Sequence, residues 1–138
     1  MREILFRGKR TDNREWAYGF YALKGKAYKR QEQHCICVST LASDCGFSYF
    51  VDLEVIPETV GQYTGLTDKN GKKIFEGDIV AEFGEYAYEV KWDVNTANFY
   101  LWYVAAESYT DFYEVPAGRL EIIGNIHDNP ELLKGGAE

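Results

Sequence analysis

The chain is poor in the residues that build disulfide frameworks, metal centres and membrane spans. Its 138 residues include only three cysteines, two histidines and one methionine. An odd number of cysteines without an export signal favours reduced thiols over a disulfide framework. No apolar run approaches the ~18 residues of a membrane span, and the opening segment MREILFRGKR lacks the apolar core of a signal peptide. We therefore expect a cytoplasmic protein that makes no membrane contact.

Positive charge is scarce as well. Lysine and arginine number 15 against 22 aspartates and glutamates, which gives a formal net charge of -7 and a pI of about 4.9. Proteins that bind nucleic acid present positive charge to its phosphates, so broad binding of this kind is disfavoured. The basic residues nevertheless gather in the N-terminal third, whereas acidic residues dominate from Glu76 onward. A local basic patch that binds nucleic acid therefore stays open as an alternative.

Aromatic residues are abundant, with 11 tyrosines, 8 phenylalanines and 3 tryptophans. Aromatic and β-branched side chains pack well on a pleated sheet, and a hydrophobic content of 46% supplies a core. We predict an all-β, β-rich fold with minor helix. The runs with strand-like composition are residues 4–6, 16–23, 27–30, 34–40, 53–57, 62–66, 73–75, 78–83, 86–92, 99–105 and 120–126. A turn is predicted at Lys24–Lys26, where Gly25 separates two of these runs.

The strands fall into two predicted parts. Residues 1–56 have the pattern of a β meander, and residues 57–138 have the strand spacing of an SH3-like small antiparallel barrel with a short C-terminal turn and tail. No proline-rich or low-complexity linker separates the two parts. We therefore expect the meander to pack on the barrel around one shared core.

Residues 59–80, with the sequence TVGQYTGLTDKNGKKIFEGDIV, carry the strongest local signals. Asn70 and Gly71 stand between two strand-prone runs and tolerate the positive φ of a hairpin turn. Gly77 and Asp78 precede an apolar run, a pattern typical of a chain that bends sharply into a strand. We interpret these four residues as structural turn residues.

The same block resembles the YopX family of phage and prophage proteins, together with FRGKR at residues 6–10 and IGNIHDNPEL at residues 123–132. The resemblance runs over nearly the whole chain. It implies a phage or prophage origin, a bacterial host cell as the location and a shared fold. It implies no reaction.

Four residues have the side chains of a zinc site, since imidazole and thiolate groups bind zinc: His34, Cys35, Cys37 and Cys45. On a strand Cys35 and Cys37 point to one face while His34 points to the other. The longer gap that usually separates paired cysteine ligands is also missing. We interpret the cysteines as reduced thiols and expect no metal and no cofactor.

Two arrangements have the residue types of acid–base catalysis. Glu76 and Asp78 are paired carboxylates at a turn, and His127 is next to Asp128. A role in the turn is sufficient to explain the two carboxylates. The side chains of His127 and Asp128 should point apart, because neighbouring side chains on an extended chain do so. No nucleophile motif or phosphate-binding glycine loop accompanies them. We therefore expect that the protein is not an enzyme.

The remaining candidates are interaction residues: Trp16, Tyr18, Lys29 and Arg30, from a stretch in which aromatic and basic side chains are interleaved, and the aromatic Trp102. Such mixtures occur at protein interfaces and at sites that stack on nucleic-acid bases. The net negative charge of the chain favours a protein interface over a nucleic-acid site. The leading hypothesis is a phage-derived accessory protein that acts as a non-enzymatic interaction module for an unidentified host or phage protein and also forms a homo-oligomer. The alternative is nucleic-acid binding through the basic N-terminal third.

Overall fold

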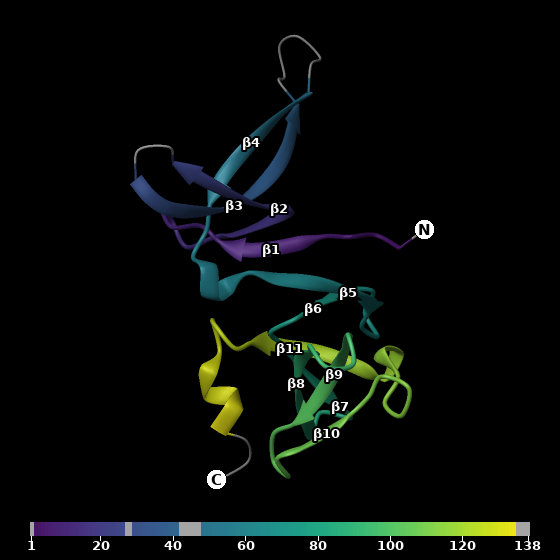
Figure 1. The fold of residues 1–138 in the computed structure, drawn as a ribbon. Helices are drawn as coiled ribbons and strands as arrows, with labels where there is room; N and C mark the ends of the chain where they lie inside the picture. The colour runs from purple at the N-terminus through teal and green to yellow at the C-terminus, as the bar shows by residue number, and fades with distance from the viewer. Residues whose placement is uncertain (1, 27–28, 42–47, 135–138) are drawn as a thin grey trace. The chain divides into compact units, whose positions relative to one another are not determined.

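The computed structural model describes residues 2–26, 29–41 and 48–134, with the backbone alone at residues 26, 29–31, 40–41 and 48 (Figure 1). Its elements are antiparallel strands and short 3-10 helices, so the all-β prediction is confirmed. Within these residues no helix has the length and hydropathy to cross a membrane. The chain divides into two compact units, Met1–Gln62 (unit 1) and Tyr63–Glu138 (unit 2).

Unit 1 is an antiparallel sheet in the order β4-β3-β2-β1, and the first residues of β5 pair with β1. Its elements are β1 (Phe6–Lys9), β2 (Trp16–Lys26), β3 (Lys29–Leu41), β4 (Ser48–Glu54), the 3-10 helix η1 (Pro57–Thr59) and the start of β5 (Gly61–Thr67). Figure 1 shows β2 and β3 as a long hairpin.

Strand β2 continues through the turn that the sequence predicts at Lys24–Lys26. That prediction is wrong, because these residues pair with β3 as far as the pair Lys26 and Lys29. The register shifts between Gly25 and Lys26, as at a β-bulge, where glycine accommodates the local bend. Gly25 therefore belongs to an irregularity within the strand.

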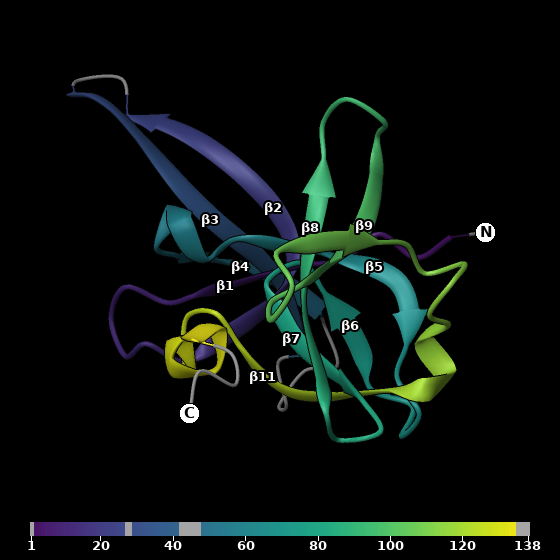
Figure 2. The ribbon, with the colours of Figure 1, turned by 90° about the horizontal axis from the view of Figure 1, so that it is seen from below.

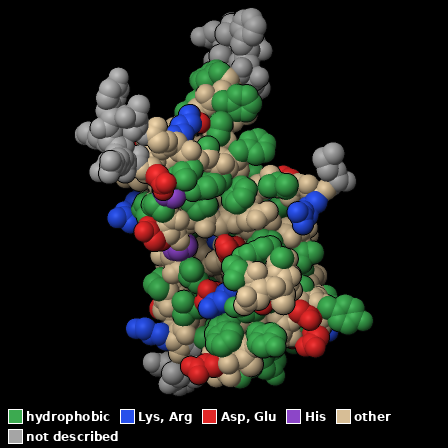
Figure 3. Space-filling view, viewed as in Figure 1, with side chains coloured by type: hydrophobic (Ala, Val, Ile, Leu, Met, Phe, Trp, Pro, Cys, Tyr) green, Lys and Arg blue, Asp and Glu red, His purple; other side chains and the backbone are tan. Residues whose placement is uncertain are grey.

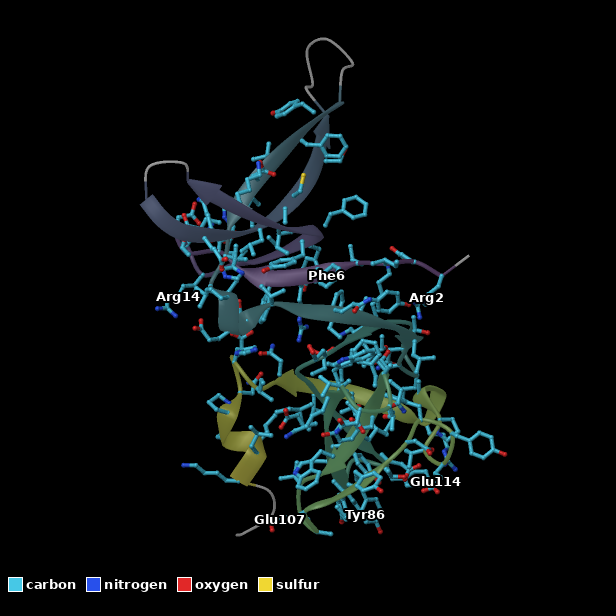
Figure 4. All side chains as sticks on the ribbon, viewed as in Figure 1. Arg2, Phe6, Arg14, Tyr86, Glu107 and Glu114 are labelled. Atoms are coloured by element: carbon cyan, nitrogen blue, oxygen red, sulfur yellow. The ribbon has the colours of Figure 1, made fainter. Side chains whose placement is uncertain are left out.

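One face of the unit 1 sheet forms a small core, and most of its side chains come from every second position of the strands. The buried centre is Ala17, Ile36 and Val55, against which pack the partly buried Phe6, Tyr21, Val38, Leu53 and Val60. Gly19 lets β2 approach β3 closely, because a Cβ at this position would lie 2.2 Å from the carbonyl oxygen of Cys37. Phe6 lies on β1, as Figure 4 shows.

Unit 2 contains a five-stranded antiparallel sheet in the order β10-β9-β8-β7-β11, preceded by the β5–β6 hairpin (Figures 1 and 2). Its remaining elements are β6 (Lys73–Phe75), β7 (Asp78–Glu82), β8 (Tyr86–Asp93), β9 (Asn98–Tyr103), β10 (Ser108–Thr110), the 3-10 helices η2 (Ala117–Arg119) and η3 (Pro130–Lys134), and β11 (Leu120–Asn125).

One face of this sheet carries the core of unit 2, and we call it the inward face. Its buried members are Ile74, Val80, Tyr88, Val90, Leu101, Val115, Ala117 and Leu120. The period of two in β8 predicts a buried face of Tyr86, Tyr88, Val90 and Trp92. Tyr88 and Val90 are buried, whereas Tyr86 and Trp92 are 42% and 41% exposed, because they lie near the ends of the strand.

The predicted barrel is not closed. In the described residues β10 and β11 form the two edges of an open sheet and do not pair with each other. A closed barrel requires every strand to pair with a neighbouring strand on each of its two sides. Strand β10 has only three residues, and after it the chain leaves the sheet through a turn in which the Val115 N–H bonds to the Asp111 carbonyl. This short strand explains why the sheet stays open.

The loop between β5 and β6 is organised by the buried side chain of Asp68. Its Oδ1 accepts hydrogen bonds from the backbone N–H groups of Asn70 and Lys72, both at 2.9 Å. Gly71 has a φ of +80°, a conformation that glycine adopts without strain. Asn70 and Gly71 therefore lie in a turn whose shape depends on Asp68.

Gly77 and Asp78 form the bend between β6 and β7. Gly77 has a φ of +93°, and the Asp78 Oδ2 accepts a hydrogen bond of 2.8 Å from the Phe75 N–H. The Gly77 N–H donates to the Val90 carbonyl, and its carbonyl accepts from the Ile126 N–H. The bend thus joins β6 and β7 to residues of β8 and to the chain just after β11.

Candidate functional site

The candidate metal ligands of unit 1 lie on opposite faces of β3. His34 faces Tyr21 of β2, whose hydroxyl is 2.5 Å from the His34 Nδ1. Cys35 and Cys37 point to the other face, where Cys35 is buried and Cys37 is half-buried. Cys45 lies outside the described residues. Within the part that the structure describes, no three His, Cys, Asp or Glu side chains come close enough to hold a metal ion.

The surroundings of both described thiols favour the protonated form. Burial raises the pKa of Cys35, and the Asp52 carboxylate raises it further. Burial also raises the pKa of Cys37, and so does its hydrogen bond to Asp52. Since the thiolate is the reactive and metal-binding form, this environment lowers the reactivity of both cysteines.

Of the candidate interaction residues of unit 1, Trp16 makes contacts within the unit. The Arg7 guanidinium lies 4.5 Å from the centroid of the Trp16 ring, and the Lys9 Nζ lies 5.6 Å from it. Tyr18 is 47% exposed on the same strand. Lys29 and Arg30 belong to β3, but their side chains lie outside the described part.

Two other cations of the N-terminal third are paired with carboxylates. Arg10 binds Asp12, and Lys24 binds Asp52. These ion pairs reduce the positive charge that the described part of unit 1 offers to a phosphate backbone.

The outward face of β8, β9 and β10 presents aromatic side chains together. In this register Glu89 lies opposite Trp102, Lys91 lies opposite Tyr100, and Trp102 also pairs with Tyr109 of β10. Tyr103, the next residue after Trp102, instead points inward and packs on the core. Alternation along β9 therefore separates two outward aromatics from the inward ones.

A concavity of about 360 Å³ lies on this outward face. We call it the aromatic cleft. Eight residues line it: Asp93, Thr96, Asn98, Tyr100, Trp102, Tyr109, Thr110 and Asp111. Tyr100 and Tyr109 meet edge to face, with centroids 6.3 Å apart and an interplanar angle of 83°. The Lys91 Nζ lies 5.4 Å from the centroid of the Trp102 ring.

Turns that follow β8 and β10, at the same end of the sheet, position the carboxylates of the cleft. Asp93 Oδ1 accepts a hydrogen bond from the Asn95 N–H at 2.9 Å, and Asp111 Oδ1 accepts one from the Glu114 N–H at 2.9 Å. The Asn95 N–H lowers the pKa of Asp93, and the Thr96 side chain and N–H lower it further. Asp93 is therefore a fixed anion at neutral pH.

Glu89 differs from Asp93, although both belong to β8 and face outward. Burial raises the pKa of Glu89, and the nearby Lys91 only partly opposes this effect.

Figure 3 shows hydrophobic and acidic side chains next to one another over unit 2, and Figure 4 marks Tyr86, Glu107 and Glu114 around these strands. The geometry suits a binding surface that combines ring faces with negative charge.

Of the cleft residues, sequence reasoning singled out Trp102 alone as an interaction residue. The alternation of Tyr100 and Trp102 along one run is a signal that could have paired them. Tyr109, Asp93 and Asp111 could not be added in this way, because the pairing of β10 with β9 and the turn geometry bring them together.

The sequence matches the YopX protein family over residues 5–134, nearly the full chain. The chain belongs to the YopX family. Comparison with curated proteins gives no match. The crystal structure of protein EF1440 from Enterococcus faecalis is similar to this YopX-family chain, with a TM-score of 0.56 and 22% identity over 96% of this chain and 99% of that chain. At this identity the likeness shows the fold alone.

Two motifs that resemble the YopX family have structural roles here. The Asp68 turn shapes the β5–β6 loop, as described above. Near the C-terminus, the Asn129 Oδ1 accepts a hydrogen bond from the Asn125 N–H at 3.3 Å. A Cβ at Gly124 would lie 2.5 Å from this Oδ1, so the glycine leaves room for Asn129.

Proposed function

We propose that this YopX-family protein is a non-enzymatic interaction module that binds a protein partner through the aromatic cleft. The observation that carries the proposal is the convergence of Tyr100, Trp102 and Tyr109 around one concavity. Tyrosine and tryptophan are enriched at protein interfaces, where they bury a large area at a low cost in conformational entropy. Tyr109 is 78% exposed, so it is available to a partner.

The cleft suits recognition better than chemistry. Its lining contains carboxylates, hydroxyls, an amide and aromatic rings, but no histidine, cysteine or lysine. The ring of Tyr109 can be covered by a partner without any rearrangement of the core, because the core lies on the opposite face of the sheet.

Position-specific photo-crosslinking tests this function. A benzophenone amino acid replaces Tyr109 in one variant and Tyr113 in another, and the adducts formed in producing cells are identified by mass spectrometry. Tyr113 is the matched control because it is 93% exposed and does not line the cleft. We expect protein adducts from position 109 that are absent from position 113. Trp102→Ala should reduce the yield of the position 109 adducts at least fivefold.

Equal adducts from both positions, or no adduct from position 109, would contradict the proposal. The mass of the adduct also separates a second copy of this chain from a different protein. A homodimer adduct would identify self-association as the use of the cleft.

Nucleic-acid binding through the N-terminal third is the weaker candidate. Arg10 and Lys24 are already paired with carboxylates. Labelled single- and double-stranded DNA and RNA at low salt would test it directly, since electrostatic binding is strongest there.

A further inference from the structure

The charge of the aromatic cleft has one sign. Two of the eight lining residues, Asp93 and Asp111, are carboxylates, and none is lysine or arginine. Asp93 ends β8 and Asp111 directly follows β10, so the two anions lie at the ends of the strands that flank β9. The rings of Tyr100 and Trp102 come from β9, between these two flanking strands.

One ring of the cleft, that of Trp102, already interacts with a cation. The ammonium of Lys91 lies 5.4 Å from the Trp102 ring centroid, within the range of a cation–π contact. Lys91 itself does not line the cleft. The faces of the two tyrosine rings and the two carboxylates therefore offer the same chemistry to a cation from outside.

We propose that the partner segment bound in the aromatic cleft carries an arginine or lysine side chain, which lies against the tyrosine rings and pairs with Asp93 and Asp111. This inference rests on the proposed protein-binding function. Arginine fits best, because a planar guanidinium stacks on aromatic rings and binds carboxylates in a bidentate way. The net charge of -7 also attracts a basic segment over longer distances.

An arginine peptide and its neutral copy test the inference. The probes are fluorescein-labelled (Gly-Arg)4-Gly and the same peptide with citrulline in place of every arginine. Citrulline keeps the shape of the side chain and removes its charge. By fluorescence anisotropy at low salt we expect the arginine peptide to bind at least tenfold more tightly than the citrulline peptide.

Matched variants separate the cleft from general attraction between opposite charges. Asp93→Asn with Asp111→Asn keeps the acceptors of both turns and should weaken arginine-peptide binding about tenfold. Glu85→Gln with Glu131→Gln removes the same charge from exposed positions outside the cleft and should change binding less than twofold. Likewise, Tyr109→Ala should weaken binding, whereas Tyr113→Ala should not.

Equal affinity for both peptides, or equal losses in both double variants, would overturn the inference. So would tight binding of maltohexaose or cellohexaose without binding of the arginine peptide, which would identify a carbohydrate site. If the arginine peptide fails to bind while position 109 still gives specific protein adducts, the basic partner is wrong and the interaction function stands. If both experiments fail, neither stands.

Discussion

The carboxylate of Asp68 accepts a hydrogen bond from the backbone N–H of Ile122, with 3.1 Å between Oδ2 and N, across a sequence separation of 54 residues. The other oxygen of Asp68 accepts the N–H groups of Asn70 and Lys72. The Lys69 N–H also donates to the Leu120 carbonyl, at 2.8 Å. One buried side chain therefore holds the β5–β6 turn and connects it to β11.

Asp68→Asn should destabilise unit 2. The amide can keep the bonds to Asn70 and Lys72, but its NH2 group would then face the Ile122 N–H, donor against donor. We expect a loss of about 2 kcal/mol in the free energy of unfolding, the scale of a buried hydrogen bond to a charged group. Urea denaturation measures it. Asp12→Asn, in an exposed turn, is the control and should change stability by less than about 0.5 kcal/mol.

The same carboxylate should contribute to acid sensitivity. Burial alone would raise the pKa of Asp68, but the N–H donors of Ile122, Lys72 and Asn70 outweigh it and leave the pKa below its ordinary value. A carboxylate with a lowered pKa in the folded state stabilises the fold above its unfolded pKa of about 4, and this contribution is lost as the pH falls through the folded pKa. Urea midpoints between pH 7 and pH 2.5 should therefore fall less steeply in Asp68→Asn than in the parent. Parallel curves would exclude this role.

Two glycines of β2 should respond differently to the same substitution. A Cβ at Gly19 meets the backbone carbonyl of Cys37, whereas a Cβ at Gly25 has no heavy atom within 4 Å. We expect Gly19→Ala to cost about 3 kcal/mol, at the upper end for overpacking, because β3 must move away. Gly25→Ala should be neutral or slightly stabilising. Thermal unfolding of the two variants checks the difference, and equal stabilities would contradict the close approach of β2 and β3.

The reactivity of Cys37 should depend on Asp52. Burial and the Asp52 carboxylate raise the pKa of this thiol, so little thiolate is present at neutral pH. In a Cys45→Ser background, iodoacetamide should modify Cys37 slowly at pH 7 and faster as the pH rises. Asp52→Asn should lower the pKa and speed the reaction at pH 7. Peptide mass mapping distinguishes Cys37 from the buried Cys35, and an unchanged rate in Asp52→Asn would show that Asp52 does not set the reactivity.

Local patterns predicted much of the fold. Glycine and asparagine placed a turn near Asn70, and alternation placed Tyr88 and Val90 in the core, because backbone dihedrals and the period of a strand act over a few residues. Gly25 shows the limit of such signals. Glycine accommodates a bulge as readily as a turn, and only the pairing of β2 with β3 decides between them.

The sequence by itself determined the β-rich character of the protein, its family and the aromatic, acidic composition of its C-terminal half. Tertiary structure decided which of those residues meet. The open sheet depends on the short β10, the bond of Asp68 to Ile122 spans much of unit 2, and the aromatic cleft needs Tyr109 in register with Trp102. These contacts join residues from separate strands, and strand register is a property of the whole sheet.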